Sequence, residues 1–382
     1  MKIVYCIGSL AQAGGVERVL INKANFLADS TVYDVTILIA KQNNSPICYP
    51  VSKNVKIVDL DIKVSTAFLS KIPVLGFFLT ISSLKKQYQR VLDELKPDIV
   101  INVERGYEDF IIPSLKKGYS TIRESHSSKA AVKIMDTNSY LLSFYNLKKK
   151  YFTYLYNRQL QKFDKVVLLT HQDAKERGYP NGDVVIPNLV SSFDIDVKYN
   201  AQSKKVISVG RLDQFKNFKD QILVWKDIVE LYPDWTLHIY GDGPDKNNLI
   251  ELIQQCQLDK NVFLEGKSAK IQEHYAASSF FIFTSVAEGF GMVLVEAMQL
   301  GLPVVSYDCP CGPSEIIEEG KDGFLVKVSD TKTLKKHMLN LIADENLRIA
   351  MSQQAIQKSK KFLPEVIMPQ WMDLFQKLHN GK

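Results

Sequence analysis

The chain has 382 residues, of which 46% are hydrophobic and 24% charged, as is ordinary for a globular protein, and its length predicts about two domains. The five cysteines are an odd number without a paired spacing, which favours a reducing compartment over a disulfide framework. The net charge is +6, but no recognised nucleic-acid-binding motif accompanies it, so nucleic acid is not an expected partner.

This charge is divided unevenly along the chain. Residues 1–190 carry 26 basic and 17 acidic side chains, a net charge of +9, whereas the remainder has a net charge of −3. We expect the basic half to attract an anionic membrane or a polyprenyl diphosphate acceptor.

The first predicted element is an apolar strand over residues 3–7, followed by Gly14, Gly15 and a helical pattern. The apolar run is shorter than the roughly 7 to 15 residues that a signal peptide needs, so we expect a cytoplasmic protein. Glycines in the loop allow the backbone to approach a ligand. Glu17 and Arg18 are either contacts to an acceptor or phosphate, or an exposed first helical turn.

Apolar runs alternate with helical patterns through the rest of the first half. They predict strands over residues 35–39, 56–60, 98–103, 121–124 and 166–169. His126 follows one of these strand ends, beside Arg123 and Glu124. A lone histidine is more often structural than catalytic, and its position at a strand end makes it a candidate site residue.

The stretch 67–84 is rich in apolar residues but is broken by Lys71, Pro73 and Gly76. A membrane span needs roughly 20 uninterrupted apolar residues, so the alternatives are a buried helical pair and an exposed apolar surface for a lipid. Nearby basic and aromatic residues have a composition that is typical of segments in the headgroup layer of a bilayer. These residues are Lys85, Lys86, Arg90, Lys148 to Lys150, Tyr151, Phe152, Tyr154 and Tyr156.

A domain boundary is predicted near Ile186, Pro187 and Asn188, because proline and asparagine end the first set of strands. We therefore expect a first domain over 1–190 and a second over 191–364. A final amphipathic helix occupies 365–382. Alternating strands and helices in both halves predict an α/β protein with two parallel, doubly wound sheets.

In the second half, polar residues gather where strands end. Arg211 and Lys216 follow the strand 206–209, and Gly266 and Lys267 follow the strand 261–264. Because ligands bind outside the carboxyl ends of parallel strands, these residues are expected at one crevice. A guanidinium with an ammonium suits a diphosphate. The alternative for either cation alone is a solvated loop residue.

The most informative segment follows the apolar strand 280–283. Glu288 is followed by a helix that opens on glycines, and Glu296 lies roughly 7 to 8 Å deeper along it. The unpaired amides of such a helix start favour a phosphate. The two carboxylates are too far apart to serve one atom, so they suit opposite ends of a nucleotide sugar. The alternative is a helix-capping Glu288 and a solvated Glu296. The glycine-opened start comprises Gly289, Phe290, Gly291, Met292 and Val293.

This segment, from Glu288 to Glu296 and on through Gly301 and Pro303, resembles the signature of the family 4 glycosyltransferases. Further landmarks in the family order are Gly210, Arg211, Lys216, Gly241, Asp242, Gly243, Ile186, Pro187, Asn188, Asp322, Gly323 and Phe324. The match is looser in the first half, where Gly14, Gly15 and His126 carry it. The resemblance implies the GT-B fold, two Rossmann-like domains facing a cleft, with the last helix crossing back to the first domain.

The resemblance also implies roles for site residues. Glu288 would hold the sugar hydroxyls and Glu296 the ribose hydroxyls, while the backbone around Gly266 and Lys267 would hold the base. His126 would close on the sugar near the anomeric centre. Arg211, Lys216 and the helix amides would stabilise the departing diphosphate, without an essential metal or other cofactor.

We therefore expect a retaining glycosyltransferase that moves a hexose or N-acetylhexosamine from a UDP-sugar to a glycan or polyprenyl-linked acceptor in surface polysaccharide or glycoconjugate synthesis. Contact with the inner face of the membrane is expected through the basic half. Three alternatives remain: a GT-B epimerase, a glycoside hydrolase using Glu288 and Glu296, and a non-catalytic nucleotide-sugar-binding subunit. A hydrolase is disfavoured because retaining glycosidases need carboxyls about 5 Å apart across one bond.

Overall fold

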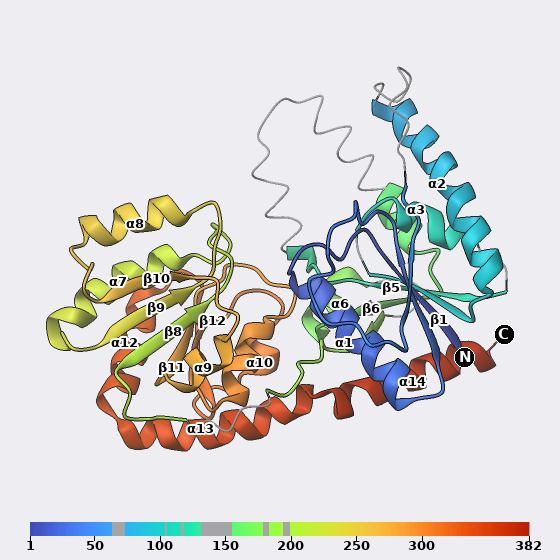
Figure 1. Cartoon of the computed structure of the whole chain (residues 1–382). Coiled ribbons are helices and arrows are strands. Elements are labelled where there is room, and N and C mark those ends of the chain that lie inside the picture. Colours follow the sequence, from blue (N-terminus) through green and yellow to red (C-terminus); the bar gives the residue numbers. More distant parts are fainter. Residues whose placement is uncertain are drawn as a thin grey trace.

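The computed structural model describes residues 1–62, 73–103, 105–115, 118–130, 155–178, 183–193 and 199–381. Two parallel sheets form two α/β domains, with helices against the sheets (Figure 1). This confirms the predicted fold class. Each sheet is doubly wound, because its first strand in sequence lies inside the sheet and the chain then proceeds outward in both directions.

The first sheet has the strand order β3-β2-β1-β4-β5-β6-β7. Its strands are β1 (Lys2–Ile7), β2 (Asp34–Ile39), β3 (Lys56–Asp59), β4 (Ile99–Asn102), β5 (Ser120–Glu124), β6 (Lys165–Leu168) and β7 (Asp183–Val185). The described helices of this region are α1 (Gly15–Ser30), α2 (Pro73–Leu95), α3 (Glu108–Ile111) and α6 (His171–Arg177), with a 3-10 turn at Ile112–Ser114. Strands β4 and β5 are buried along their whole length, as expected for a sheet covered on both faces.

The second sheet has the order β10-β9-β8-β11-β12-β13. Its strands are β8 (Lys205–Val209), β9 (Thr236–Tyr240), β10 (Val262–Gly266), β11 (Phe280–Phe283), β12 (Val304–Tyr307) and β13 (Gly323–Val326). Its helices are α7 (Phe218–Leu231), α8 (Lys246–Gln255), α9 (Ile271–Ala276), α10 (Met292–Gln299), α11 (Pro313–Ile316), α12 (Thr331–Ala343) and α13 (Glu345–Ser359), followed by a 3-10 turn at Lys360–Phe362. Strand β11 agrees with the predicted residues 280–283 and is fully buried.

The last helix, α14 (Pro364–Asn380), leaves the second domain and packs on the first (Figure 1). Ile367, Met368 and Trp371 belong to the same buried cluster as the strands β1 and β4. Ser120 at the start of β5 also donates a hydrogen bond of 3.2 Å to the carbonyl oxygen of Leu378. The predicted return of the C-terminal helix is therefore part of the observed fold.

Within the apolar stretch, the described residues 73–84 belong to one helix, α2, which begins at Pro73 and continues past Gly76 to Leu95. Proline fits a first helical position, where no backbone hydrogen bond is lost. Leu84, Tyr88 and Leu92 are buried at spacings of four residues. Residues 63–72 and 131–154, including the basic and aromatic segment 148–154, lie outside the described residues. Among the helices that the structure does describe, none has the length and apolar character to cross a membrane.

Candidate active site

The start of α1 and the residues just after β5 in the first domain lie against residues 289–292, which lead into α10 in the second. A Cβ atom added to Gly289 would lie 2.0 Å from the carbonyl oxygen of His126, and one added to Gly15 would lie 3.9 Å from the sulfur of Met292. Four predicted site residues, far apart in sequence, therefore meet where the two domains touch.

Lys216 forms an ion pair with Glu288, the residue before Gly289. The Lys216 ammonium nitrogen lies 2.5 Å from Oε1 of Glu288, and the side chains are 23% and 12% exposed. The pair is thus shielded from bulk water but still reachable by a ligand. The same ammonium lies 5.5 Å from the centroid of the Phe283 ring, at the end of β11.

Buried hydroxyl and amide groups fix the backbone beneath Lys216. The Thr284 hydroxyl donates to the carbonyl oxygens of Lys216 and Asn217, each at 3.0 Å. Gln221 of α7 in turn donates to the Thr284 hydroxyl at 2.8 Å and to that of Ser208 at 3.0 Å. Because these groups are buried and bonded to one another, the loop after β8 is held rigidly against the end of β11.

Helix α10 begins as the sequence predicts. Gly291 precedes it with φ of 95°, a left-handed conformation that glycine adopts without the cost of a Cβ clash. The amide of Leu294 donates to the carbonyl of Gly291 at 2.9 Å. Across the ranges that the structure describes, the amides of Met292 and Val293 have no hydrogen-bond acceptor, so they are available to an anion.

Phe290 is only 3% exposed, and its ring packs edge-on against Phe362 with the centroids 5.5 Å apart. Its side chain therefore belongs to the core, and only its backbone is placed to bind a donor. The Phe290 carbonyl oxygen would lie 2.1 Å from a Cβ atom at Gly312, so this loop is packed tightly against the turn before α11.

His126 makes contacts through both its backbone and its side chain. Its carbonyl group lies against Gly289, and its Nε2 atom is 3.3 Å from Oε1 of Glu124. Both side chains are largely buried, with 7% and 1% exposure. Glu124 also accepts a hydrogen bond from the ammonium group of Lys23 in α1.

Glu296 has a partner from the other domain. Nη1 of Arg18 in α1 lies 2.7 Å from Oε1 of Glu296, and the side chains are 26% and 5% exposed. The Tyr275 hydroxyl donates to the other carboxylate oxygen at 3.4 Å. Burial, with the nearby Glu296 charge, raises the pKa of Tyr275, so its hydroxyl keeps its proton as a donor.

Other predicted residues have contacts outside this ion pair. The Arg211 side chain is 72% exposed and approaches Asp213 at 3.7 Å, so it does not join Lys216 and Glu288. Gly266 has φ of +76° and accepts a hydrogen bond of 2.8 Å from the Gly241 amide, while Lys267 is exposed. The Gly14 amide bonds to the carbonyl of Gln12 at 3.0 Å.

Sequence reasoning missed three contacts that link or support the two domains. One is the Arg18–Glu296 pair, and another is the Lys23–Glu124 pair. In the third, Glu315 of α11 accepts hydrogen bonds of 3.0 and 2.9 Å from the amides of His171 and Gln172 at the start of α6. Only Lys23 carries a signal in the sequence, since it interrupts the otherwise apolar face of α1.

In the part of the chain that the structure describes, no three His, Cys, Asp or Glu side chains are grouped so that they could hold a metal ion. Cys309 and Cys311 are both buried and unbonded to each other. Burial, followed by the Glu288 charge, raises the pKa of the Cys309 thiol, which is therefore neutral and inert at physiological pH.

Comparisons with known proteins agree with this geometry. Residues 193–358 match the family model described as glycosyl transferases group 1. An uncharacterized glycosyltransferase of Haemophilus influenzae is 26% identical, covering 97% of this chain and 98% of that protein. The amylovoran biosynthesis glycosyltransferase AmsD of Erwinia amylovora is 27% identical, covering 98% and 99%.

Among solved structures, a mutant of TarM from S. aureus, in complex with UDP and other ligands, has a TM-score of 0.75. It is 17% identical and covers 98% of this chain and 99% of its own, a likeness that concerns the fold. The two sheets, the family match and the glycosyltransferase relatives together define the class: the chain is a glycosyltransferase with the GT-B fold.

Proposed function

We propose that the protein is a retaining family 4 glycosyltransferase that moves a hexose or N-acetylhexosamine from a UDP-sugar to a glycan or lipid-linked acceptor. The observation that carries this proposal is the Lys216–Glu288 pair, 2.5 Å apart at the start of α10, with His126 packed against the adjacent Gly289. A cation, two free amides and a carboxylate are thereby gathered at one place.

Each of these groups suits a different part of the donor. Breaking the glycosidic bond leaves additional negative charge on the diphosphate, and Lys216 with the amides of Met292 and Val293 would stabilise it. Glu288 would accept hydrogen bonds from the sugar hydroxyls. Glu296, further along α10, would receive the ribose hydroxyls, and Arg211 in its exposed loop would close on the diphosphate when the donor is bound.

The retaining outcome follows from attack on the same face that the diphosphate leaves, with the acceptor proton passing to a phosphate oxygen. This route needs neither a protein nucleophile nor a metal ion, so we propose metal-independent transfer. Closure of the domains would exclude water from the cleft and limit hydrolysis of the donor.

The different environments of Glu288 and Glu296 argue against a glycoside hydrolase. Glu288 pairs with Lys216, whereas Glu296 pairs with Arg18 and accepts a hydrogen bond from Tyr275. An acid and nucleophile pair would face one bond from two sides at about 5 Å. These two carboxylates instead belong to separate polar clusters.

For the acceptor, we propose a growing surface polysaccharide or glycoconjugate carried by a polyprenyl diphosphate. The name of AmsD, which places it in amylovoran biosynthesis, supports this class, as does UDP in the TarM complex for the donor. Transfer would take place at the cytoplasmic face of the membrane.

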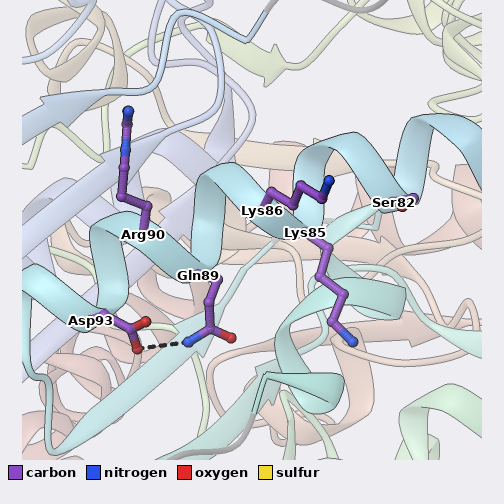
Figure 2. Close-up of a pocket in the computed structure, with 6 residues that line it drawn as sticks. All are labelled: Ser82, Lys85, Lys86, Gln89, Arg90 and Asp93. Carbon is purple, nitrogen blue, oxygen red and sulfur yellow. Dashed lines mark hydrogen bonds between the residues drawn. The ribbon is translucent and has the colours of Figure 1, made fainter.

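The basic face of α2 supports contact with an anionic membrane. Ser82, Lys85, Lys86, Gln89, Arg90 and Asp93 line a shallow surface depression of about 540 Å³ (Figure 2). Gln89 donates a hydrogen bond of 2.6 Å to Asp93. The three cations are exposed and, within the described residues, form no ion pair, so their charge is available to lipid phosphates.

A mass-spectrometric screen tests the proposal. The purified protein is mixed with UDP- and GDP-sugars and with prenyl-linked acceptors, and products are followed with and without EDTA. Transfer that depends on acceptor and survives EDTA is the expected result. Conversion of the donor without an acceptor would indicate an epimerase. Release of sugar without release of the nucleotide would indicate a hydrolase. Binding of the donor without turnover would indicate a non-catalytic subunit.

A further inference from the structure

The interior of the first domain contains a charged group with no role in donor binding. Lys23 of α1 is 1% exposed, and its ammonium group donates a hydrogen bond to Oε2 of Glu124. The same nitrogen lies 4.1 Å from the ring centroid of Trp371 in α14 and 5.5 Å from that of Tyr5 in β1. A buried cation is tolerated only when it is paired, and here the carboxylate and two aromatic faces surround it.

The second oxygen of Glu124 contacts a histidine instead of the lysine. Oε1 lies 3.3 Å from Nε2 of His126, whose side chain is 7% exposed. This Nε2 atom is buried and, within the described residues, it makes no hydrogen bond, so the approach of the Glu124 carboxylate at 3.3 Å is its recorded polar contact. Glu124 is therefore shared, with one oxygen for Lys23 and the other for His126.

We propose that Glu124 is a positioning residue for His126, and that Lys23, held under Trp371 of the returning helix α14, keeps Glu124 ionised and in place. The proposal rests on the proposed function, in which His126 approaches the donor sugar. By this proposal, the C-terminal helix helps to hold the groups that position His126.

The charges of this cluster are consistent with such a role. Burial by itself would favour the protonated acid, but the charges of Lys23 and His126 lower the pKa of Glu124 to about 2. The carboxylate is therefore ionised at any pH at which the enzyme works, and its Oε1 can only accept. A neutral His126 would then carry its proton on Nε2 and its lone pair on Nδ1.

The backbone of His126 is fixed independently by Gly289 of the second domain. With the main chain held on one side and Nε2 on the other, the imidazole has little freedom to rotate. Such a constraint is valuable near a reacting centre, because a displacement of about 1 Å can lower a rate roughly a hundredfold.

The competing interpretation is that Lys23 and Glu124 form an ion pair with a purely structural role. Buried ion pairs can often be replaced by apolar residues without loss of stability, whereas removing one partner leaves an unpaired buried charge. Replacing both partners together therefore separates the two interpretations. Stability should recover in either case, but the orientation of His126 should recover only if Glu124 has no positioning role.

The experiment compares Lys23→Met/Glu124→Met with Lys23→Met/Glu124→Gln in the full chain. Both double variants lack the buried charges, but only glutamine retains an oxygen that can accept from Nε2–H of His126. We expect both to melt near the wild-type temperature. The methionine variant should lose kcat by roughly a hundredfold, with donor KM and UDP affinity within about twofold of wild type. The glutamine variant should recover most of kcat.

Nitrogen-15 NMR of the histidine ring provides a readout that needs no turnover. Wild type and the glutamine variant should give the Nε2–H form of His126, and the methionine variant a mixture of tautomers. Arg348→Met, which removes another buried cation that donates to the carbonyl of Ala201, serves as control and should lower the melting temperature only. Wild-type kcat with the Nε2–H form in the methionine variant would overturn the positioning role. Absence of transfer by wild type would refute the proposed function and leave the tautomer result intact.

Discussion

Arg18 of α1 and Glu296 of α10 form an ion pair of 2.7 Å although 278 residues separate them in sequence. They belong to different domains, and Glu296 is the carboxylate to which we assign the ribose of the donor. In this arrangement the nucleotide and Arg18 compete for the same oxygens. Binding of the donor must therefore displace Arg18 or share Glu296 with it.

Arg18→Met should consequently tighten UDP binding. Because one side chain of the pair is partly exposed, its contribution is modest, and the expected change is roughly two- to fivefold. Glu296→Gln should weaken UDP binding by roughly tenfold, through loss of charge-assisted hydrogen bonds. Isothermal titration calorimetry measures both, and the Arg18→Met effect should disappear in the Glu296→Gln background. Weaker binding by Arg18→Met alone would show that Arg18 contacts the nucleotide instead.

Lys216→Ala and Glu288→Ala should each lower turnover by at least roughly a hundredfold, because each removes a group aimed at charge that develops in the transition state. Steady-state kinetics with the transferable donor measures the loss, and circular dichroism checks the fold. The matched control is Lys204→Ala, which removes an exposed pair with Asp234 and should keep wild-type turnover. Wild-type rates in either folded site variant would refute the assignment.

Gly289→Ala should impair activity more than stability. The added methyl group would lie 2.0 Å from the carbonyl oxygen of His126, which belongs to the other domain. The clash can be relieved by separation of the domains, so the second domain should still fold while the cleft fails to close. We expect a large fall in kcat, near-wild-type melting of the second domain, and a larger radius of gyration in solution scattering. An active, compact variant would contradict this contact.

His337 of α12 gives a pH-dependent prediction. Its ring stacks on Phe324 at 4.2 Å between centroids, and burial lowers the pKa of His337 from 6.5. At pH values between the lowered pKa of folded His337 and 6.5, the unfolded chain binds more protons than the folded chain. The free energy of unfolding therefore falls as the pH drops through 6.5. His337→Phe keeps the stack and removes the titration. Urea unfolding at pH 7 and pH 5 should therefore show a smaller acid loss for this variant than for wild type.

Reversal of the α2 charges tests the membrane contact. Lys85→Glu/Lys86→Glu/Arg90→Glu should weaken binding to vesicles that contain phosphatidylglycerol by at least roughly a hundredfold, since each cation near an anionic surface contributes about 1 kcal/mol. Wild-type binding should also weaken with salt. Sedimentation with vesicles of neutral and anionic composition measures both effects.

The matched control reverses three exposed cations of the second domain. These are Lys226, Lys260 and Lys332. The control changes the net charge by the same amount in the other domain. Equal loss of vesicle binding in the two variants would mean that net charge, rather than α2, governs the contact.

Residue type and spacing are enough to predict the local parts of this protein. The buried strand Phe280–Phe283, the glycine start of α10 and the amphipathic α14 each follow from residue type and spacing over about ten positions, because hydrogen bonding and burial within an element are local. The sequence also placed Lys216 and Glu288 at the carboxyl ends of strands, where parallel sheets bind ligands. The three-residue strand β7 was missed, since so short a run carries almost no periodic signal.

Which side chains meet, in contrast, depends on how the domains and helices pack together. The sequence grouped Arg211 with Lys216, but the observed partner of Lys216 is Glu288, 72 residues away, while Arg211 extends into solvent. Arg18 reaches Glu296, and Lys23 reaches both Glu124 and Trp371, through packing of separate domains and of the returning helix. Such pairs depend on how whole sheets and helices dock. Docking minimises buried unpaired charge and exposed apolar surface over the entire molecule, so no single segment of the sequence specifies the pairs.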